Sequence, residues 1–436
     1  MSPLDLLRRR TPATEDQRFA RGSVAVLGLG YVGLPTALSL HQERFPIIGI
    51  DLSERRMAQI RCNTADLLDR DRARLSDALD SETFALTGNE AALSQADAVI
   101  ICVPTPVHHD GQPDLTFVTR ACAAAVMHAR PGQTIVLTST TYAGTTRDLL
   151  AGPLSARGLE PGRDIFVAFS PERINPGDDA HAQDTVPRVL GGVTPACATK
   201  AFPVVAAASS KIHVVSSPEA AELTKLYENT FRAVNVALAN EMATNAKRLG
   251  IDPIEVTEAA ATKPYGFMAH WPGAGVGGHC IPCDPHYLLW QLREAGYGSP
   301  LIAEAMRSIA RRPHEVVARA EEILAADGLN LRGAKVLVNG VAYKPGVEDL
   351  RESPALTIYE GLRAGGADVA FHDPLCPEMV DADGNVVDSV DPRAFAADLV
   401  VSITLHPGAD YTWLWDAPRV LDTTYRQQAA VRRYTV

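Results

Sequence analysis

The stretch SVAVLGLGYVG, residues 23–33, is the clearest structural signal in the sequence. A short apolar run ends at a glycine, and the pattern Gly-x-Gly-x-x-Gly follows in Gly28, Gly30 and Gly33. Between a strand and a helix, such glycines let the backbone approach a pyrophosphate, whose charge the helix N-terminus stabilises. The next apolar run ends at Asp51, at the distance where a carboxylate binds the ribose of a dinucleotide. The sequence therefore predicts a dinucleotide-binding βαβ unit at its start.

The residues around Asp51 indicate which dinucleotide is bound. A carboxylate at this position accepts hydrogen bonds from the ribose hydroxyls of NAD and repels the 2′-phosphate of NADP. Arg55 and Arg56 lie close by in the sequence and weaken this preference slightly. We therefore predict NAD as the cofactor.

Further apolar runs alternate with helical stretches along the chain. After Asp51 they cover residues 97–106, 133–141 and 164–172, a rhythm typical of a parallel, doubly wound sheet. The rhythm restarts at residue 333, with four apolar runs at 334–344, 367–374, 398–404 and 419–424. This second α/β domain lacks a Gly-x-Gly-x-x-Gly pattern, so it need not hold a dinucleotide.

Two long helical patterns separate the α/β regions. The first begins at Ser217 as N-cap with Pro218 at the first helical position, and Gly250 follows its end. It predicts one helix of about thirty residues. The second runs from about Pro300 to Ala326. We expect it to be bent or broken near Pro313, because proline removes a helical hydrogen bond.

Composition restricts the possible partners and location. The chain has 436 residues and a formal net charge of -11, which argues against nucleic acid as the main partner. No stretch approaches the roughly 18 consecutive apolar residues of a membrane span. Residues 1–22 contain basic side chains but no apolar signal core, so they are interpreted as an N-terminal extension of unknown purpose. We expect a cytoplasmic protein without a membrane partner.

The stretch GVGGHCIPCDP, residues 275–285, contains two of the seven scattered cysteines. An odd, scattered set does not suggest a disulfide framework. A zinc site would need more ligands than Cys280 and Cys283, and only His279 and His286 lie close enough in the sequence to supply them. A redox pair would normally open a helix after a strand. The favoured interpretation is a single nucleophile, Cys280, on a glycine-rich loop, with Cys283 incidental and no metal.

A cysteine nucleophile together with a nicotinamide cofactor suggests a particular chemistry. A thiolate adds to an aldehyde, the resulting thiohemiacetal loses a hydride, and the thioester is hydrolysed to an acid. A dehydrogenase that stops at the aldehyde or ketone does not need the cysteine.

Seven motifs in fixed order extend this interpretation over about 330 residues of the chain. They are GLGYVG (28–33), CVPTP (102–106), STTYAGTT (139–146), SPERINPG (170–177), AELTKLYENTFRAVNVALANE (221–241), GVGGHCIPCDP (275–285) and GVAYKPGVEDLRESPAL (340–356). Together they resemble the UDP-glucose/GDP-mannose dehydrogenase family, NAD-dependent enzymes that oxidise the C6 alcohol of a nucleotide sugar to a carboxylate. The resemblance implies two Rossmann-like, doubly wound domains joined by a helical domain, whose one long central helix also builds a homodimer or a dimer-based oligomer.

The resemblance also assigns catalytic roles position by position. Cys280 matches the nucleophile that forms the thioester. Lys225 matches the lysine that stabilises an oxyanion, and Asn229 matches the asparagine that binds the C6 oxygens. Asp284 matches the aspartate that positions water or assists proton transfer. Lys225 and Asn229 are four residues apart, so they share one face of the predicted long helix.

Further matches complete the predicted site. Glu172 corresponds to the base for thioester hydrolysis, and Thr140 to a residue that holds a water. Expected cofactor contacts are Gly28, Gly30, Tyr31, Val32, Gly33, Asp51, Arg56, Val103, Pro104, Thr105, Ser139, Thr140 and Arg351. Expected substrate contacts are Glu172, Arg173, Lys225, Asn229, Gly277 and Lys344.

The resemblance divides the chain into an extension (1–22), an NAD-binding domain (23–212), a central helical domain (213–328) and a UDP-sugar-binding domain (329–436). Within the family the motifs are most similar to the UDP-N-acetylglucosamine 6-dehydrogenase branch. UDP-glucose and UDP-N-acetylmannosamine are the alternative substrates. Two interpretations from other classes stay open: a nucleotide-sugar-binding protein without turnover, and a β-hydroxyacid dehydrogenase, which would need neither Cys280 nor a second α/β domain.

Overall fold

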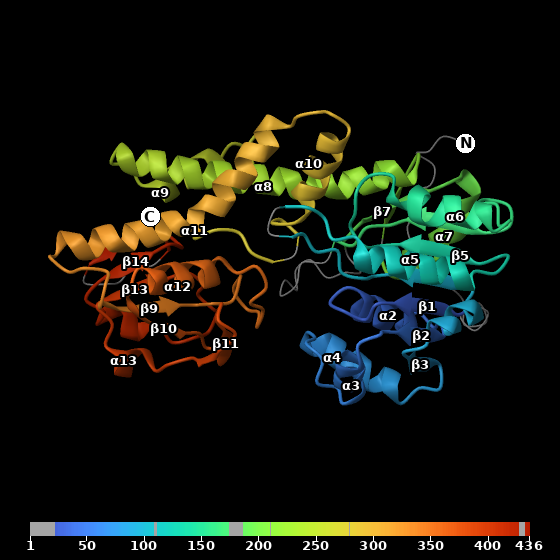
Figure 1. Ribbon diagram of the computed structural model, residues 1–436, viewed down its shortest axis with the longest axis horizontal. Helices are drawn as coiled ribbons and strands as arrows, with labels where there is room; N and C mark the ends of the chain where they lie inside the picture. Colours follow the sequence, from blue (N-terminus) through green and yellow to red (C-terminus); the bar gives the residue numbers. More distant parts are fainter. Residues whose placement is uncertain (1–21, 109–110, 174–185, 210, 279, 427–431) are drawn as a thin grey trace. The chain divides into compact units, whose positions relative to one another are not determined.

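The computed structural model describes residues 22–108, 111–173, 186–209, 211–278, 280–426 and 432–436. It separates into two compact units (Figure 1). The first runs up to Tyr227 and also takes in His286–Gln291, and the second comprises Glu228–Pro285 and Leu292–Val436. The predicted extension at residues 1–22 lies outside the described residues, apart from its last residue.

The first unit is built on an eight-stranded sheet with the order β3-β2-β1-β4-β5-β6-β7-β8. Its strands are β1 (Val24–Leu27), β2 (Ile47–Ile50), β3 (Phe84–Thr87), β4 (Ala98–Ile101), β5 (Thr134–Leu137), β6 (Phe166–Phe169), β7 (Arg188–Gly192) and β8 (Ile212–Val215). Neighbouring strands are parallel except β6 and β7, which pair antiparallel. The predicted parallel sheet is confirmed, with one reversal that the strand rhythm did not predict.

Helices cover both faces of this sheet, because successive strand residues point to opposite sides and both sets are apolar. One buried cluster packs the sheet against α2 and α7, through residues such as Leu34 and Val204, and another packs it against α5, through residues such as Val118. The helices of this unit are α2 (Gly33–Gln42), α3 (Glu54–Arg61), α4 (Asp69–Leu79), η2 (Glu90–Gln95), α5 (Thr116–His128), η3 (Arg147–Ala151), α6 (Gly152–Ala156) and α7 (Pro195–Ala207). The doubly wound arrangement is confirmed.

The predicted long helix is α8, Pro218–Arg248, with 31 residues. The side chain of Ser217 accepts a hydrogen bond from the backbone N–H of Ala220 at 3.2 Å, and Pro218 is the first helical residue. Both signals at the start of this helix, and its length, are as the sequence predicted.

The second unit contains a five-stranded parallel sheet with the order β10-β9-β13-β14-β15. Its strands are β9 (Lys335–Asn339), β10 (Asp368–His372), β13 (Leu399–Ser402), β14 (Val420–Asp422) and β15 (Arg433–Tyr434). A separate hairpin is formed by β11 (Glu378–Val380) and β12 (Val386–Asp388), and the helical segments of this region are α12 (Pro354–Ala364), α13 (Pro392–Phe395) and η5 (Thr412–Trp415). The second α/β domain is confirmed, and β15 was not predicted.

The remaining helices are α9 (Pro253–Ala261), α10 (Asp284–Glu294) and α11 (Pro300–Ala326). Pro313 lies inside α11, which continues as one helix through it. Figure 1 shows the ribbon of α11 changing direction partway along its length. The expected break at Pro313 is therefore wrong, whereas a bend at this residue stays a prediction.

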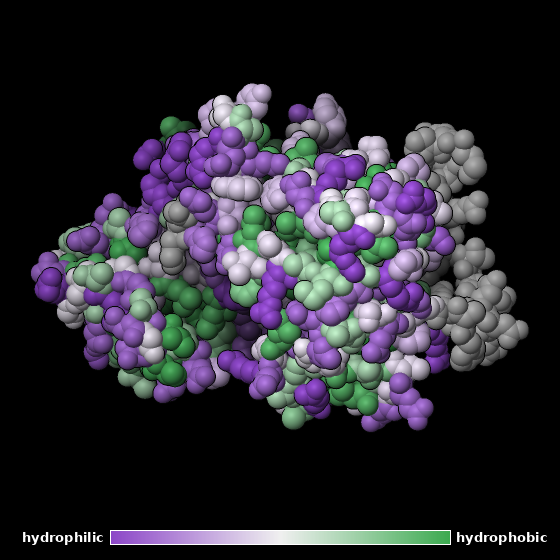
Figure 2. All heavy atoms as spheres, turned by 45° about the vertical axis from the view of Figure 1, so that its right-hand side comes forward, coloured by the Kyte–Doolittle hydropathy of each residue, from purple (hydrophilic) through white to green (hydrophobic). Residues whose placement is uncertain are grey.

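The surface of the described residues is mixed in character. On the face drawn in Figure 2, hydrophilic side chains are interspersed with hydrophobic ones. No helix in the described part of the chain is long and apolar enough to cross a membrane. The fold class is confirmed, whereas the boundaries of the four predicted segments stay a prediction.

Candidate active site

The glycine-rich turn after β1 has the geometry that a pyrophosphate needs. Gly28 has a positive φ of 91°, and a Cβ there would lie 2.5 Å from the carbonyl oxygen of Cys102. A Cβ on Gly33 would overlap the carbonyl oxygen of Gly28. A Cβ on Gly30 would meet nothing within 4 Å, so this residue faces open space. Two glycines thus shape the turn, and the third leaves room for a ligand at the start of α2.

The side chains of Asp51 and Arg56 both form hydrogen bonds to the backbone of this turn. The carboxylate of Asp51 accepts the backbone N–H groups of Leu29 and Ser53, each at 2.8 Å. Arg56 donates from Nε to the carbonyl oxygen of Leu29 at 2.8 Å and forms an ion pair with Asp66. Each oxygen of Asp51 accepts one of these bonds and has a second lone pair for a ribose hydroxyl. The residues present therefore fit NAD.

Ser139, whose contact with the cofactor stays a prediction, is bonded to the backbone of Val103. Its buried hydroxyl accepts the backbone N–H of Val103 at 2.9 Å and donates to the carbonyl oxygen of Val103 at 2.8 Å. It therefore ties the end of β5 to the turn that contains Pro104 and Thr105. Pro104 is exposed, whereas Thr105 and the predicted water-holding Thr140 are half-buried. Their contacts with NAD stay predictions.

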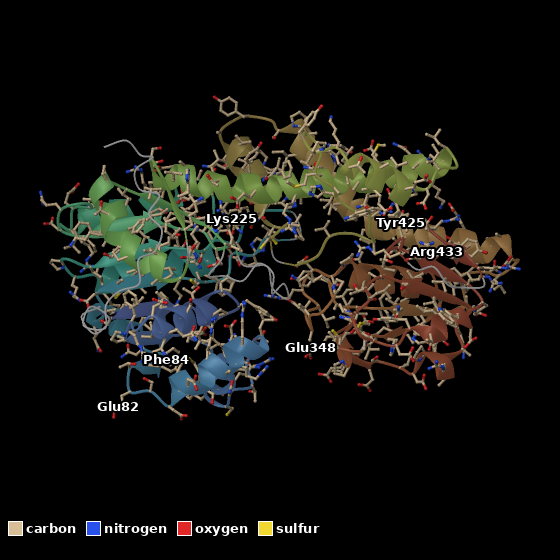
Figure 3. The ribbon with its side chains drawn as sticks, turned by 180° about the vertical axis from the view of Figure 1, so that it is seen from behind. Glu82, Phe84, Lys225, Glu348, Tyr425 and Arg433 are labelled. Atoms are coloured by element: carbon tan, nitrogen blue, oxygen red, sulfur yellow. The ribbon has the colours of Figure 1, made fainter. Side chains whose placement is uncertain are left out.

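Glu172 and Lys225, predicted to act in catalysis, meet in the first unit. The buried Lys225 extends from α8 (Figure 3), and its Nζ donates to the main-chain oxygen of Glu172 at 2.8 Å. The Glu172 carboxylate forms an ion pair with Arg188 and accepts the backbone N–H of Arg173 at 2.8 Å. The sequence-predicted pair is thus brought together, and Arg188 joins it.

The other predicted catalytic residues lie in the second unit. Asn229 and Asp284 are each 4% exposed, and Nδ2 of Asn229 donates to the Asp284 carboxylate. The carbonyl oxygen of Cys280 accepts the backbone N–H of Asp284 at 2.9 Å and that of Cys283 at 3.3 Å. This turn leads from Cys280 into α10, at whose first residue Asp284 stands. Cys280 is exposed, whereas Cys283 is buried.

The glycines before Cys280 pack against the loop that follows β9. A Cβ on Gly277 would lie 2.7 Å from Cβ of Tyr343, and one on Gly278 would lie 2.8 Å from its Cε2. Gly278 has a φ of 80° and donates its N–H to the carbonyl oxygen of Arg351 at 3.0 Å. Burial raises the pKa of Tyr343 to about 12, so its hydroxyl keeps its proton. The loop that carries Cys280 is therefore shaped by contacts to an aromatic ring.

Lys344 and Arg351 lie on that same loop after β9. The Nζ of Lys344 is 5.6 Å from the centroid of the Tyr343 ring. Arg351 donates to Asp349 through Nε at 2.9 Å and Nη2 at 2.6 Å. Their predicted contacts, with substrate for Lys344 and with cofactor for Arg351, stay predictions.

Comparison with known proteins decides the family. The models of the UDP-glucose/GDP-mannose dehydrogenase family match residues 22–209 as its NAD binding domain, residues 219–310 as its central domain and residues 337–427 as its UDP binding domain. The chain belongs to this family. It is an NAD-dependent nucleotide-sugar dehydrogenase, and NAD is its cofactor.

Relatives in this family differ in the sugar that their names specify. A UDP-N-acetyl-D-glucosamine 6-dehydrogenase of Pseudomonas aeruginosa is 35% identical over 355 residues, 80% of this chain and 82% of the relative. Among solved structures, a UDP-D-ManNAc dehydrogenase of Pyrococcus horikoshii covers 95% of this chain and 98% of its own, with a TM-score of 0.85 and 30% identity. A UDP-glucose dehydrogenase of Pyrobaculum islandicum covers 95% and 97%, with a TM-score of 0.84 and 28% identity.

The zinc alternative concerns His279 and His286. Among the residues that the structure describes, no three His, Cys, Asp or Glu side chains gather where they could hold a metal ion. His279 lies outside the described residues. The absence of a metal from the site stays a prediction.

Three residues that help to form the candidate site of this dehydrogenase were not found from the sequence: Arg188, Glu222 and Tyr343. Glu222, buried on α8, accepts the backbone N–H groups of Gly144 at 2.6 Å and Thr146 at 2.9 Å. It thereby fixes the turn that follows Thr140. All three act on residues far away in sequence, so no local pattern predicts them.

Proposed function

We propose that this dehydrogenase oxidises the C6 alcohol of UDP-N-acetylglucosamine to the uronic acid, with transfer of four electrons, through a thiohemiacetal and a thioester on Cys280. The observation that carries the proposal is the setting of Cys280. Cys280 is exposed on a loop shaped by Tyr343, and its carbonyl oxygen begins the turn to Asp284, which is bound to Asn229. An exposed cysteine held in this way is suited to act as a nucleophile.

The first oxidation takes the alcohol to an aldehyde. The hydroxyl proton passes to a base, for which Asp284 acting through a water is the proposed acceptor, and the C6 hydride leaves the carbon. Each oxidation would need its own NAD molecule as hydride acceptor, so two NAD are consumed in sequence for each sugar. Lys225 and Asn229 stabilise the charge that develops on the oxygen.

The second oxidation requires the cysteine. The Cys280 thiolate forms a bond to the aldehyde carbon, and the resulting thiohemiacetal loses a second hydride to become a thioester. Glu172 takes a proton from water, whose oxygen attacks the thioester carbonyl, and Cys280 leaves as the thiolate. Thr140 is proposed to hold this water. In total one alcohol and one water yield one carboxylate, with two hydrides transferred.

The choice of UDP-N-acetylglucosamine rests on the motif resemblance and on the name of the Pseudomonas aeruginosa relative. Relatives with similar identity are named for UDP-N-acetylmannosamine, and one solved structure for UDP-glucose. These two sugars are the alternatives. A small difference at C2 is worth about 1–3 kcal/mol in a pocket, so few residues are needed to change the preference.

A homodimer is proposed from the surface of α8. Large apolar side chains are exposed on it at Leu223, Tyr227, Phe231, Leu238 and Met242. Their spacing follows a helical period, and an exposed apolar stripe of this kind is typical of an interface. Leu238→Glu should then convert a dimer to a monomer in analytical ultracentrifugation. A wild type that sediments as a monomer at micromolar concentration would contradict the proposal.

The function is tested by measuring kcat/KM for NADH formation with UDP-N-acetylglucosamine, UDP-N-acetylmannosamine and UDP-glucose. We expect the first to be preferred by about tenfold or more. Preference for either other sugar would keep the reaction and change the substrate. No reaction with any of the three would favour the nucleotide-sugar-binding protein, and reduction of NAD by a β-hydroxyacid alone would favour the other dehydrogenase class.

A further inference from the structure

The reversed strand β7 brings an arginine opposite the predicted hydrolytic base. β6 and β7 pair antiparallel, with Phe169 opposite Gly191. Extending that register past the end of β6 places Glu172 opposite Arg188, because each step forward on one strand is a step back on the other. The ion pair between these two side chains agrees with this register. A parallel β7 would not have produced this pairing.

A second contact follows the same register. Nη1 of Arg173 donates to the main-chain oxygen of Pro187 at 2.6 Å, so the residues after Glu172 and before Arg188 remain opposite one another. The backbone N–H of Arg188 donates to the main-chain oxygen of Lys211 at 2.9 Å, which fixes the arginine from its other side. Arg188 is therefore held in the sheet as the first residue of β7, whereas Glu172 lies beyond the end of β6.

The ion pair is withdrawn from solvent. The side chains of Arg188 and Glu172 are 4% and 8% exposed. Burial lowers the pKa of Arg188 to about 10, and its Nε has no acceptor among the described residues. A buried charge is unfavourable unless it is paired. The Glu172 carboxylate is the partner that compensates the charge of Arg188.

The Glu172 carboxylate and backbone are held by separate groups. One carboxylate oxygen meets Arg188, and the other accepts the backbone N–H of Arg173. The main-chain oxygen accepts Nζ of Lys225. Lys225 therefore fixes where Glu172 stands, and Arg188 fixes where its side chain points.

We propose that Arg188 is a positioning residue that holds the Glu172 carboxylate for the hydrolysis of the Cys280 thioester. The inference rests on the proposed function and adds to it a residue that acts only through Glu172. It takes no part in either hydride transfer. Loss of Arg188 should therefore slow the release of the uronic acid and leave the steps that form NADH close to normal.

Lysine provides a graded substitution at this position. It keeps the positive charge but replaces the planar fork of arginine with a single point donor, so it fixes the carboxylate less well. Methionine fills a similar volume without charge. We expect thioester hydrolysis to be slowest in Arg188→Met, intermediate in Arg188→Lys and fastest in the wild type.

The test is a single-turnover experiment with excess enzyme and NAD and with the UDP-sugar that the wild type oxidises. NADH is followed by absorbance, and the adduct on Cys280 by intact-protein mass spectrometry. In Arg188→Met we expect NADH formation within about twofold of wild type and decay of the adduct slower by about tenfold or more, the effect of impairing a general base. Glu172→Gln serves as the reference for loss of the base itself.

The double variant Arg188→Met/Glu172→Gln makes the test specific. If Arg188 acts only through Glu172, the double variant should lose the adduct no more slowly than Glu172→Gln alone. Effects that multiply would overturn the proposal, as would wild-type adduct decay in a folded Arg188→Met. Should Arg188→Met not fold, Arg188→Lys decides: slower adduct decay supports the inference and unchanged decay contradicts it. If the wild type forms no adduct and no NADH, the proposed function itself has failed.

Discussion

The two α/β sheets share one structural feature but differ in the ligand-binding capacity that it leaves. In each, the loop after a central strand is held by an aspartate that follows the neighbouring strand. Asp51, after β2, holds the loop after β1, and Asp373, after β10, holds the loop after β9. The Asp51 carboxylate can still accept hydrogen bonds from a dinucleotide, whereas all the lone pairs of the Asp373 carboxylate are taken by protein donors.

The difference lies in how many groups each aspartate binds. Asp51 is half-buried and accepts two backbone N–H groups. Asp373 is 3% exposed and also bonded to the ring of His406. The backbone N–H groups that it accepts are those of Val341, Ala342, Leu375 and Cys376. A carboxylate with this many donors has no capacity left for a ribose.

The loops that the two aspartates hold also differ. After β1, helix α2 begins at Gly33, so its N-terminus can approach a phosphate. After β9, helix α12 begins only at Pro354, and the intervening loop carries Tyr343, Lys344 and Arg351. The same contact between an aspartate and the neighbouring loop thus leaves room for a ligand in one domain and supports a long loop with candidate functional side chains in the other.

The largest effect should come from Asp373→Asn. It removes the charge from a buried group with several donors, so we expect a loss of about 3 kcal/mol in the free energy of unfolding. Hydrogen exchange of peptides from β9 and β10 would show this as faster exchange, while peptides from β1 and β2 serve as the internal control. Equal changes in both sheets would show that Asp373 does not stabilise the second sheet specifically.

Acid should weaken the second sheet through the same residue. Burial would raise the pKa of Asp373, but hydrogen bonds from His406 and from the backbone of Ala342 and Leu375 outweigh it and lower the pKa to about 2. Because the folded pKa lies below the ordinary value of 3.8, the stabilisation is present above pH 3.8 and is lost as the pH falls through 2.

The loss of this stabilisation is measured by comparing the unfolding free energies of the wild type and Asp373→Asn. The free energy of urea unfolding of the wild type minus that of Asp373→Asn should shrink by roughly 2 kcal/mol between pH 4 and pH 2. A difference that stays constant over this range would mean that the Asp373 carboxylate is not stabilised in the folded protein.

Gly30→Ala tests the open space at the first loop. A Cβ there meets no protein atom within 4 Å, so the melting temperature should stay close to that of wild type. The methyl group would enter the room left for the pyrophosphate, and the Kd for NAD should rise by about tenfold or more, or ~1.4 kcal/mol. Gly33→Ala is the control: its Cβ overlaps the Gly28 carbonyl, so it should lower stability instead.

Asp51→Asn should have the smallest effect of the set. The amide keeps one acceptor oxygen for Leu29 or Ser53 but loses the charge that repels a 2′-phosphate. The ratio of kcat/KM for NAD to that for NADP should fall by about tenfold, with a loss of unfolding free energy of about 1 kcal/mol or less. An unchanged ratio would place cofactor selection on another residue, with Arg56 in α3 as the first candidate.

Much of this architecture could be predicted because it is local. Apolar runs predicted β1, β2, β4, β5 and β6 in the first sheet and β9, β10, β13 and β14 in the second, and Ser217 with Pro218 predicted the start of α8. The short β15 has only two residues, too few for a periodic signal. The reversal of β7 depends on pairing with β6, which no run of residues within β7 specifies.

The residues of the candidate site also fall into two groups, those that local motifs predicted and those that only tertiary packing brings there. Motif resemblance predicted Glu172, Lys225, Asn229, Cys280 and Asp284, and the structure places Glu172 against Lys225 and Asn229 against Asp284. Their supporting groups could not be predicted, because Arg188, Glu222 and Tyr343 reach their targets only through tertiary packing. Ser139, predicted to contact the cofactor, also bonds to the backbone of Val103, a contact that the motif resemblance did not predict.

Substitutions of the two neighbouring cysteines, Cys280 and Cys283, test whether the proposed chemistry depends on Cys280 alone. Cys280→Ser should abolish uronic acid formation, because a serine hydroxyl at neutral pH is a far weaker nucleophile than a thiolate. Cys283→Ser, in a buried residue of the same turn, should keep most of the activity. Zinc in the wild type together with an inactive Cys283→Ser would restore the metal interpretation.

The most direct test of the central claim is the number of NADH molecules formed per UDP-N-acetylglucosamine supplied in limiting amount. Oxidation through Cys280 to the acid predicts two, with the uronic acid as the product. One NADH per sugar, with an aldehyde or ketone as the product, would contradict the thioester mechanism.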